Sequence, residues 1–136
     1  MEATDILRLH NIKKTPGRLA IIRALQESIL PLSENDIKVK MNDFYDRVTF
    51  YRNIQTLSTL GVIHKIVIDN TLVKYGLNFC DNGHHHQNEH AHFYCEDCQE
   101  VICLKQVSIP QINLPGSYKV TDKDFILKGK CEHCNH

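Results

Sequence analysis

Two Cys-x-x-Cys pairs constrain this chain more than any other feature of its sequence. The first pair is Cys95 and Cys98, and the second is Cys131 and Cys134, close to the end of the chain. Four thiolates in two such pairs are the ligand set around which a structural, tetrahedral Zn²⁺ site closes. The segment between the pairs is longer than usual, but loop length alone adds little closure entropy. We therefore expect a small C-terminal domain that depends on one structural zinc ion.

Disulfides and a redox dithiol are the competing interpretations of these cysteines. The N-terminal residues, MEATDILRLH, do not combine a basic segment with an apolar one as a secretion signal does. We therefore expect a cytoplasmic protein with reduced thiols, and no apolar run is long enough to span a bilayer. A thioredoxin-like dithiol is a single pair beside a βαβ pattern, which this sequence lacks. Zinc is favoured, and buried free thiols stay open as the alternative.

The first half of the chain carries start signals for three helices. Each is an N-cap residue followed by apolar residues at helical spacing, at Thr15, Ser33 and Asp46. Pro16 suits a first helical position, Asp36 completes a capping box, and Gly61 is typical of a helix end. In the first of these helices the expected buried positions are Leu19, Ile22, Leu25 and Ile29.

After Gly61 the apolar period changes from helical spacing to alternation. The segment VIHKIVIDNTLVKYGL indicates two strands joined by a turn around Asp69 and Asn70. Three short helices followed by a hairpin is the order of a winged helix-turn-helix. Its later helix, expected over residues 47–60, enters the major groove in DNA-binding members of this class.

The face of that helix opposite its apolar side fits a DNA-contacting role. Phe50, Ile54 and Leu57 share one face, while the other carries Arg52 and small hydroxyl residues such as Thr49. Arginine is the commonest reader of guanine. The chain as a whole is neutral, with 16 Lys plus Arg against 16 Asp plus Glu. A protein-interaction module therefore stays open as the alternative.

These segments together resemble the ferric uptake regulator family of bacterial metal-responsive repressors. The matching segments occur in the family's order and are KKTPGRLAII, VTFYRNIQTLSTLGVIHKI, HAHFYCEDCQEVIC and KCEHC. The resemblance implies an α+β chain with an N-terminal winged helix-turn-helix DNA-binding domain over residues 1–78. It also implies a linker over residues 79–89 and a small α/β dimerisation and metal-binding domain with a four-cysteine zinc site over residues 90–136.

By the same resemblance, the chain is a transcriptional repressor of metal-uptake genes and not an enzyme. It would act as a homodimer on a near-palindromic operator in double-stranded DNA, with no membrane or small-molecule substrate. Tyr51 and Arg52 occupy the positions of the family's base-contacting pair, and Thr49 lies on the same expected surface. Lys14 and Arg18 resemble its phosphate or minor-groove contacts.

The resemblance further implies a regulatory metal site made from separate parts of the chain. His90 and His92 match a His-x-His pair, and their alternation places both on one face of a strand. His64 and Cys80 match ligand positions of the family's zinc-sensing branch. One thiolate with imidazoles favours Zn²⁺ over Fe²⁺ or Mn²⁺. A ferrous-iron or peroxide-responsive regulator, with Fe²⁺ or Mn²⁺ as the regulatory ion, stays open as the alternative.

Two departures from the family concern the C-terminal half. The acidic and histidine ligands of a further family site are replaced here by Ala91, Cys103 and Lys123. Whether Glu89, Cys103 and the run His84–His86 rebuild that site is left open. Prolines also interrupt a stretch in which relatives carry a longer helix, at Pro110 and Pro115.

Other function classes fit the cysteines and histidines less well. A zinc hydrolase carries His-Glu-x-x-His, and HQNEHAH lacks that order. A zinc deaminase has a proline before its Cys-x-x-Cys, and neither pair here is preceded by one. A zinc-ribbon interaction module without a DNA partner would explain the zinc but not the expected helices and hairpin.

Overall fold

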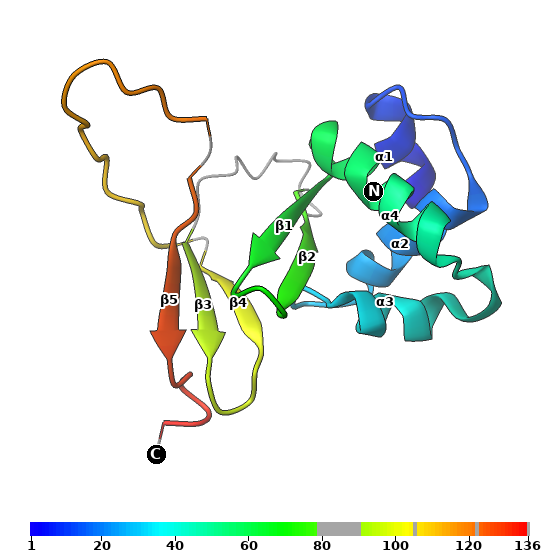
Figure 1. Cartoon of the computed structure of the whole chain (residues 1–136). Coiled ribbons are helices and arrows are strands. Elements are labelled where there is room, and N and C mark those ends of the chain that lie inside the picture. Colours follow the sequence, from blue (N-terminus) through cyan, green and yellow to red (C-terminus); the bar gives the residue numbers. More distant parts are fainter. Residues whose placement is uncertain (79–90, 105, 122, 136) are drawn as a thin grey trace. The chain divides into compact units, whose positions relative to one another are not determined.

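The chain is mixed α+β, which confirms the predicted fold class (Figure 1). The computed structural model describes residues 1–78, 91–104, 106–121 and 123–135. The chain divides into two compact units, residues 1–86 and 87–136. The linker expected over residues 79–89 lies outside the described residues, so the finer domain limits stay predictions.

The N-terminal unit is a helical cluster followed by a hairpin. Its helices are α1 (Ala3–Leu9), α2 (Pro16–Gln26), α3 (Glu34–Met41), the 3-10 turn η1 (Asn42–Phe44) and α4 (Arg47–Thr59). The predicted helix starts are all present, whereas α1 was not predicted. The sequence signal is weak there because Glu2, its N-cap, makes no side-chain capping bond, and the helix is held by buried Ala3, Ile6 and Leu7.

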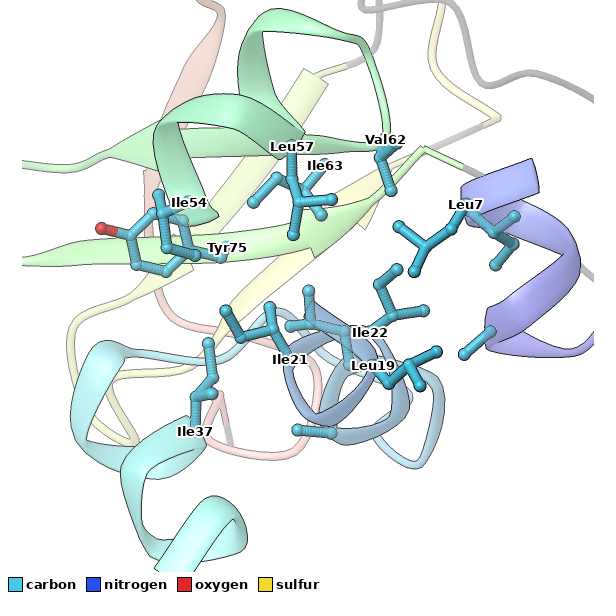
Figure 2. Packing of buried hydrophobic residues seen from close by; sticks show 14 of the residues in the cluster. Leu7, Leu19, Ile21, Ile22, Ile37, Ile54, Leu57, Val62, Ile63 and Tyr75 are labelled. Atoms are coloured by element: carbon cyan, nitrogen blue, oxygen red, sulfur yellow. The ribbon is translucent and has the colours of Figure 1, made fainter. Parts of the chain in front are cut away.

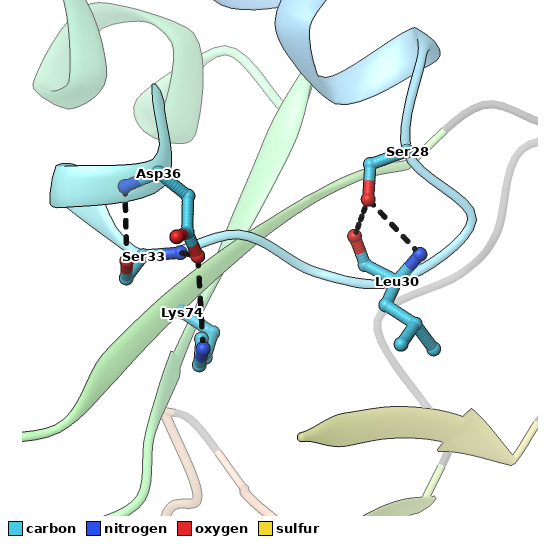
Figure 3. Close-up of polar contacts among 5 residues, drawn as sticks. All are labelled: Ser28, Leu30, Ser33, Asp36 and Lys74. Atoms are coloured by element: carbon cyan, nitrogen blue, oxygen red, sulfur yellow. Dashed lines mark hydrogen bonds and ion pairs between the residues drawn. The ribbon is translucent and has the colours of Figure 1, made fainter. Parts of the chain in front are cut away.

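Side-chain caps fix where the three predicted helices begin. The Thr15 hydroxyl accepts from the Arg18 amide at 3.3 Å, and the Asp46 carboxylate accepts from the Thr49 amide at 2.9 Å. Ser33 and Asp36 bond each other's backbone amides at 3.1 Å in both directions, a complete capping box (Figure 3). Such a cap contributes about 0.5–2 kcal/mol to helix stability.

The C-terminal ends of these helices were predicted less well from the sequence than their starts. Gly61 has a positive φ of 79°, as expected for the residue that stops α4. The first predicted helix was too long, because α2 ends at Gln26 and Ile29 is wholly exposed. The Ser28 hydroxyl bonds both polar groups of the Leu30 backbone and turns the chain there (Figure 3).

The core of the N-terminal unit draws on all four α-helices and on the hairpin. Figure 2 shows apolar side chains converging from α1, α2, α3, α4 and the segment after α4, among them Leu7, Ile21, Ile22, Ile37, Leu57, Val62 and Ile63. Burying one such side chain contributes roughly 1.5–3 kcal/mol. This packing fixes α4 on its apolar side and leaves its other side for function.

The hairpin of this unit is formed by β1 (Ile63–Val67) and β2 (Val73–Leu77), which pair antiparallel. The Asp69 carboxylate closes the predicted turn by accepting from the amides of Thr71 and Leu72 at 2.8 and 2.9 Å. Leu32 exchanges backbone bonds with Tyr75, which attaches the segment before α3 to the outer side of the hairpin. Three helices and this hairpin confirm the winged helix-turn-helix arrangement.

The described part of the C-terminal unit is a small sheet with long loops. Strand β3 (Ala91–Cys95) lies between β4 (Val101–Leu104), which is antiparallel to it, and β5 (Ile126–Gly129), which is parallel. Residues 106–121 and 123–125 contain no helix, in keeping with the prolines there. No described helix is both long and apolar enough to cross a membrane.

Candidate metal centres and nucleic-acid interface

The four cysteines of the two pairs converge at one end of the C-terminal sheet. The parallel pairing of β3 with β5 places Cys95 beside Gly129, so the two Cys-x-x-Cys turns leave the sheet side by side. The four sulfur atoms lie within 4.8 Å of one another, and Cys98 Sγ lies 4.0 Å from Cys131 Sγ. Thiolates about 2.3 Å from a tetrahedral zinc are roughly 3.8 Å apart. The four-cysteine cluster therefore fits a structural zinc ion.

Hydrogen bonds from backbone amides favour the thiolate form of one of these four cysteines, Cys95. Cys95 Sγ accepts from the amides of Cys98 at 3.5 Å and Cys131 at 3.4 Å, and these bonds lower the pKa of the Cys95 thiol to about 6. A hydrogen bond with Cys131 and burial raise the pKa of Cys134 to about 12. Negative charge on several adjacent sulfurs is unfavourable without a cation. A bound divalent cation offsets the repulsion between the negatively charged sulfurs, so that all four thiols can be deprotonated as metal ligands.

The polar side of α4 is exposed over its N-terminal half. Thr49 and Arg52 are exposed, and Tyr51 retains 43% of its accessible surface. On the opposite side Phe50, Ile54 and Leu57 are buried, as the apolar pattern predicted. The predicted DNA-facing residues of α4 therefore share one accessible surface.

A carboxylate that the sequence reasoning missed holds this surface in place. Glu34, the first residue of α3, accepts from the hydroxyls of Tyr45 and Tyr51 at 2.5 Å each. The Arg47 guanidinium lies 6.0 Å from the Tyr51 ring centroid. The bond to Glu34, followed by burial, raises the pKa of Tyr45 to about 12 and also raises that of Tyr51. Nothing local in the sequence marks Glu34, because its partners come from later elements.

The two residues predicted to contact phosphate, Lys14 and Arg18, differ in how firmly their side chains are held. Lys14 is exposed. Arg18 is partly buried, and it donates from Nε to Asn53 Oδ1 at 3.2 Å and from Nη1 to the Lys13 carbonyl at 2.7 Å. These bonds fix its guanidinium between α2 and α4 and leave other N–H groups of the fork for an outside acceptor.

His64, a predicted regulatory ligand, has a defined ring orientation within the N-terminal unit. Its Nδ1 donates to Asn78 Oδ1 at 2.7 Å, since the Asn78 amide nitrogen itself donates to the Gly61 carbonyl at 2.9 Å. A neutral ring bonded in this way carries its lone pair on Nε2, the atom that would bind a metal. Gly76 makes room for the ring, because a Cβ there would lie 2.7 Å from His64 Cε1. Asn78 was also missed by the sequence reasoning.

Only one member of the predicted His-x-His pair falls in the described residues. His92 lies on β3, and its register partner on β4 is Cys103. Cys80 and His90 lie outside the described residues, as do Glu89 and the run His84–His86. The predicted regulatory set therefore stays a prediction.

Comparison with known proteins identifies the family. The model of the ferric uptake regulator family matches residues 10–128, nearly the whole chain. The chain belongs to this family. Members of the ferric uptake regulator family are metal-responsive transcription regulators, not enzymes, which agrees with the expectation drawn from the sequence.

Individual relatives support the same assignment. The ferric uptake regulation protein of Bacillus subtilis (strain 168) is 26% identical over an alignment 137 residues long, which covers 95% of this chain and 89% of that protein. A structure described as a zinc uptake regulator complexed with zinc and DNA superposes with a TM-score of 0.70 at 20% identity, covering 97% of this chain and 89% of that one. The Vibrio cholerae ferric uptake regulator gives a TM-score of 0.63 at 20% identity, covering 94% and 98%. At such identities the structural likeness shows a shared fold.

Proposed function

We propose that this family member is a zinc-responsive repressor that binds DNA as a cytoplasmic homodimer. The observation that carries the proposal is the exposed N-terminal half of α4, which presents Thr49, Tyr51 and Arg52 together on a winged helix-turn-helix. In this fold class the N-terminal residues of the later helix reach base edges in the major groove. A two-fold homodimer carries two such helices and would read a near-palindromic operator.

Each residue of the surface has a distinct role in this proposal. Arg52 is the base reader, because its guanidinium matches the two acceptors of guanine in the major groove. The hydroxyl of Tyr51 is held by Glu34, so its exposed ring is the part that faces the DNA, where it can contact a thymine methyl group. Lys14 and Arg18 contact the phosphate backbone and set the position of α4.

We propose that the regulatory ion is bound by His64, Cys80, His90 and His92. The orientation of His64 by Asn78 supports the first of these ligands, because metal-binding histidines commonly donate their other N–H to a fixed acceptor. A thiolate with neutral imidazoles is a set that prefers Zn²⁺ over Fe²⁺ and Mn²⁺. The zinc uptake regulator named above is described as bound to both zinc and DNA, which agrees with this choice.

Residues from both units of the chain would then share one ion. His64 belongs to the N-terminal unit and His92 to the C-terminal unit. Ligands held on one ion restrict the relative orientation of the two units, and a restricted dimer presents its two α4 helices at a fixed separation. By thermodynamic linkage, DNA should then tighten metal binding by the same factor by which the metal tightens DNA binding.

Substitution of Arg52 tests the DNA-binding half of the proposal. Arg52→Ala should weaken operator binding by about 1–3 kcal/mol, roughly 5- to 150-fold, with an unchanged zinc content. Gln55→Ala is the matched control, because Gln55 is also exposed on α4 and one turn further along. If the Arg52→Ala variant and the wild type bind the operator with equal affinity, α4 does not read the major groove. That result would favour a zinc-ribbon interaction module.

A further inference from the structure

We propose that Cys103 supplies a thiolate to the regulatory ion, beside His92, and that this pair makes the site selective for thiophilic divalent cations such as Zn²⁺. This inference rests on the proposed function, because it names a further ligand of the same site. It adds a sulfur from the described C-terminal sheet to a set whose other thiol, Cys80, lies outside the described residues.

The strand register brings Cys103 and His92 together. They are directly opposite each other in the antiparallel β3–β4 pair, so their side chains lie on the same face of the sheet. The cysteine sulfur and a ring nitrogen of the histidine lie within 4.8 Å of each other. Both side chains are half-buried, which limits competition from water while leaving one side open to further ligands.

The pair is distinct from the four-cysteine cluster. Side chains alternate along a strand, so His92 and Cys95 point to opposite faces of β3. The four clustered sulfurs already form a complete tetrahedral set without Cys103. Among the described residues no cysteine forms a disulfide.

The backbone around the pair is rigid. Strand β3 is hydrogen bonded on both edges, to β4 and to β5, and the His92 amide donates to the Phe125 carbonyl at 2.9 Å. Two ligands on neighbouring strands of one sheet lose little freedom when they bind an ion, and such preorganised ligands bind more tightly.

The chemistry of the pair determines which ion it prefers. A thiolate and an imidazole are the ligands favoured by Zn²⁺, whereas Mn²⁺ and Mg²⁺ favour carboxylates, carbonyls and water. If Cys80 also binds, the site has two thiolates and its preference for zinc over manganese increases further. Cys103 is therefore a residue that sets metal specificity.

Cobalt spectroscopy tests this assignment directly. Co²⁺ added to protein that keeps its structural zinc enters the regulatory site, and each bound thiolate contributes to a ligand-to-cobalt charge-transfer band. We expect Cys103→Ser to remove about half of the wild-type band, and Cys80→Ser to remove the other half. A band that disappears in Cys103→Ser but survives in Cys80→Ser also supports the inference and rejects Cys80. Zinc content and circular dichroism, recorded before and after the titration, show that the four-cysteine site and the fold are unchanged.

Two results separate the failure of this inference from that of the proposed function. A wild-type band that Cys103→Ser leaves unchanged would overturn the role of Cys103 and leave the proposed regulatory site standing. If the wild-type protein, with only its structural zinc bound, gives no band when Co²⁺ is added, both the role of Cys103 and the proposed regulatory site are overturned. Cys103→Asp, which keeps an anionic ligand, should retain metal binding but lower the ratio of Zn²⁺ to Mn²⁺ affinity at least tenfold. An unchanged ratio would contradict the claim about specificity.

Discussion

The hydroxyl of Tyr51 donates a 2.5 Å hydrogen bond to Glu34, so the start of α3 holds a residue of the proposed DNA-reading surface on α4. The second oxygen of the same carboxylate accepts from Tyr45 at the same distance. Burial raises the pKa of Glu34, but the bonds from the two tyrosines outweigh it and keep that pKa below its usual value. The orientation of Tyr51 therefore depends on a charge in a different helix.

Glu34→Gln should weaken both folding and DNA binding. Loss of the charged acceptor should lower the free energy of unfolding by about 1–2 kcal/mol, because hydrogen bonds to a charged group are stronger than neutral ones. Tyr51 would then sample other rotamers, and operator affinity should fall several-fold. Chemical denaturation and fluorescence anisotropy measure the two effects.

Glu27→Gln is the matched control for this change. It removes the same charge from an exposed side chain whose partner is Lys40 at 3.4 Å, and exposed pairs of this kind contribute about 0–1 kcal/mol. If the two glutamine variants behave alike, the bonds to the tyrosines contribute nothing specific and the account of Glu34 fails.

The same carboxylate sets the pH range over which this contact stabilises the unit. A tyrosine whose pKa is raised by folding contributes stability that is complete below about pH 10 and is lost as the pH rises towards 12. Glu34, whose pKa is lowered, contributes stability that is complete above pH 4.5 and is lost as the pH falls below that value. In a phenolate absorbance titration, Glu34→Gln should make Tyr45 and Tyr51 ionise at a lower pH than they do in the wild type. Superimposable titration curves would contradict the contact.

Asn78 should control the affinity of the regulatory site without binding the ion. Asn78→Ala removes the acceptor of the His64 N–H and should weaken regulatory zinc binding about 10- to 100-fold. Asn78→Asp keeps an acceptor for His64 while losing the donor to the Gly61 carbonyl, so it separates ring orientation from loop stability. Competition with a zinc-binding dye measures both variants. Equal losses in the two would show that loop stability, not the His64 ring, is what Asn78 provides.

Cys98→Ser should remove the structural zinc and unfold the small C-terminal sheet. The zinc content should fall by one ion per chain, and hydrogen exchange should show lost protection in β3 and β5, because metal binding supplies folding free energy to such sites. Helical circular dichroism should persist, since the described helices belong to the N-terminal unit. Cys103→Ser, outside the four-cysteine cluster, is the control that keeps the structural zinc and the protection of β3 and β5. A zinc-free variant with a protected β3 would refute the structural role.

Local signals in the sequence were enough to predict much of the N-terminal unit. The caps at Thr15, Ser33 and Asp46 act within one helical turn, so the residues that form them are close in sequence. Helix α1 was missed because it lacks such a cap, and Ile29 was misplaced because apolar spacing alone does not mark where a helix ends.

The candidate sites depend on contacts that no local pattern records. The cysteine pairs predicted a zinc site, but the parallel pairing of β3 with β5 that unites them is long-range. Glu34 meets Tyr51 across 17 positions, and Asn78 meets His64 across 14, so both appear in the sequence as ordinary polar residues.

Metal-dependent operator binding tests the central claim most directly. Fluorescence anisotropy would follow binding of the protein, with only its structural zinc retained, to its own upstream DNA at fixed salt, with buffered Zn²⁺, anaerobic Fe²⁺, Mn²⁺ or a chelator. We predict that low free Zn²⁺ tightens binding at least tenfold, while Fe²⁺ and Mn²⁺ at the same free concentration do not. A response to Fe²⁺ or Mn²⁺ but not to Zn²⁺, or affinity that no metal changes, would contradict the account.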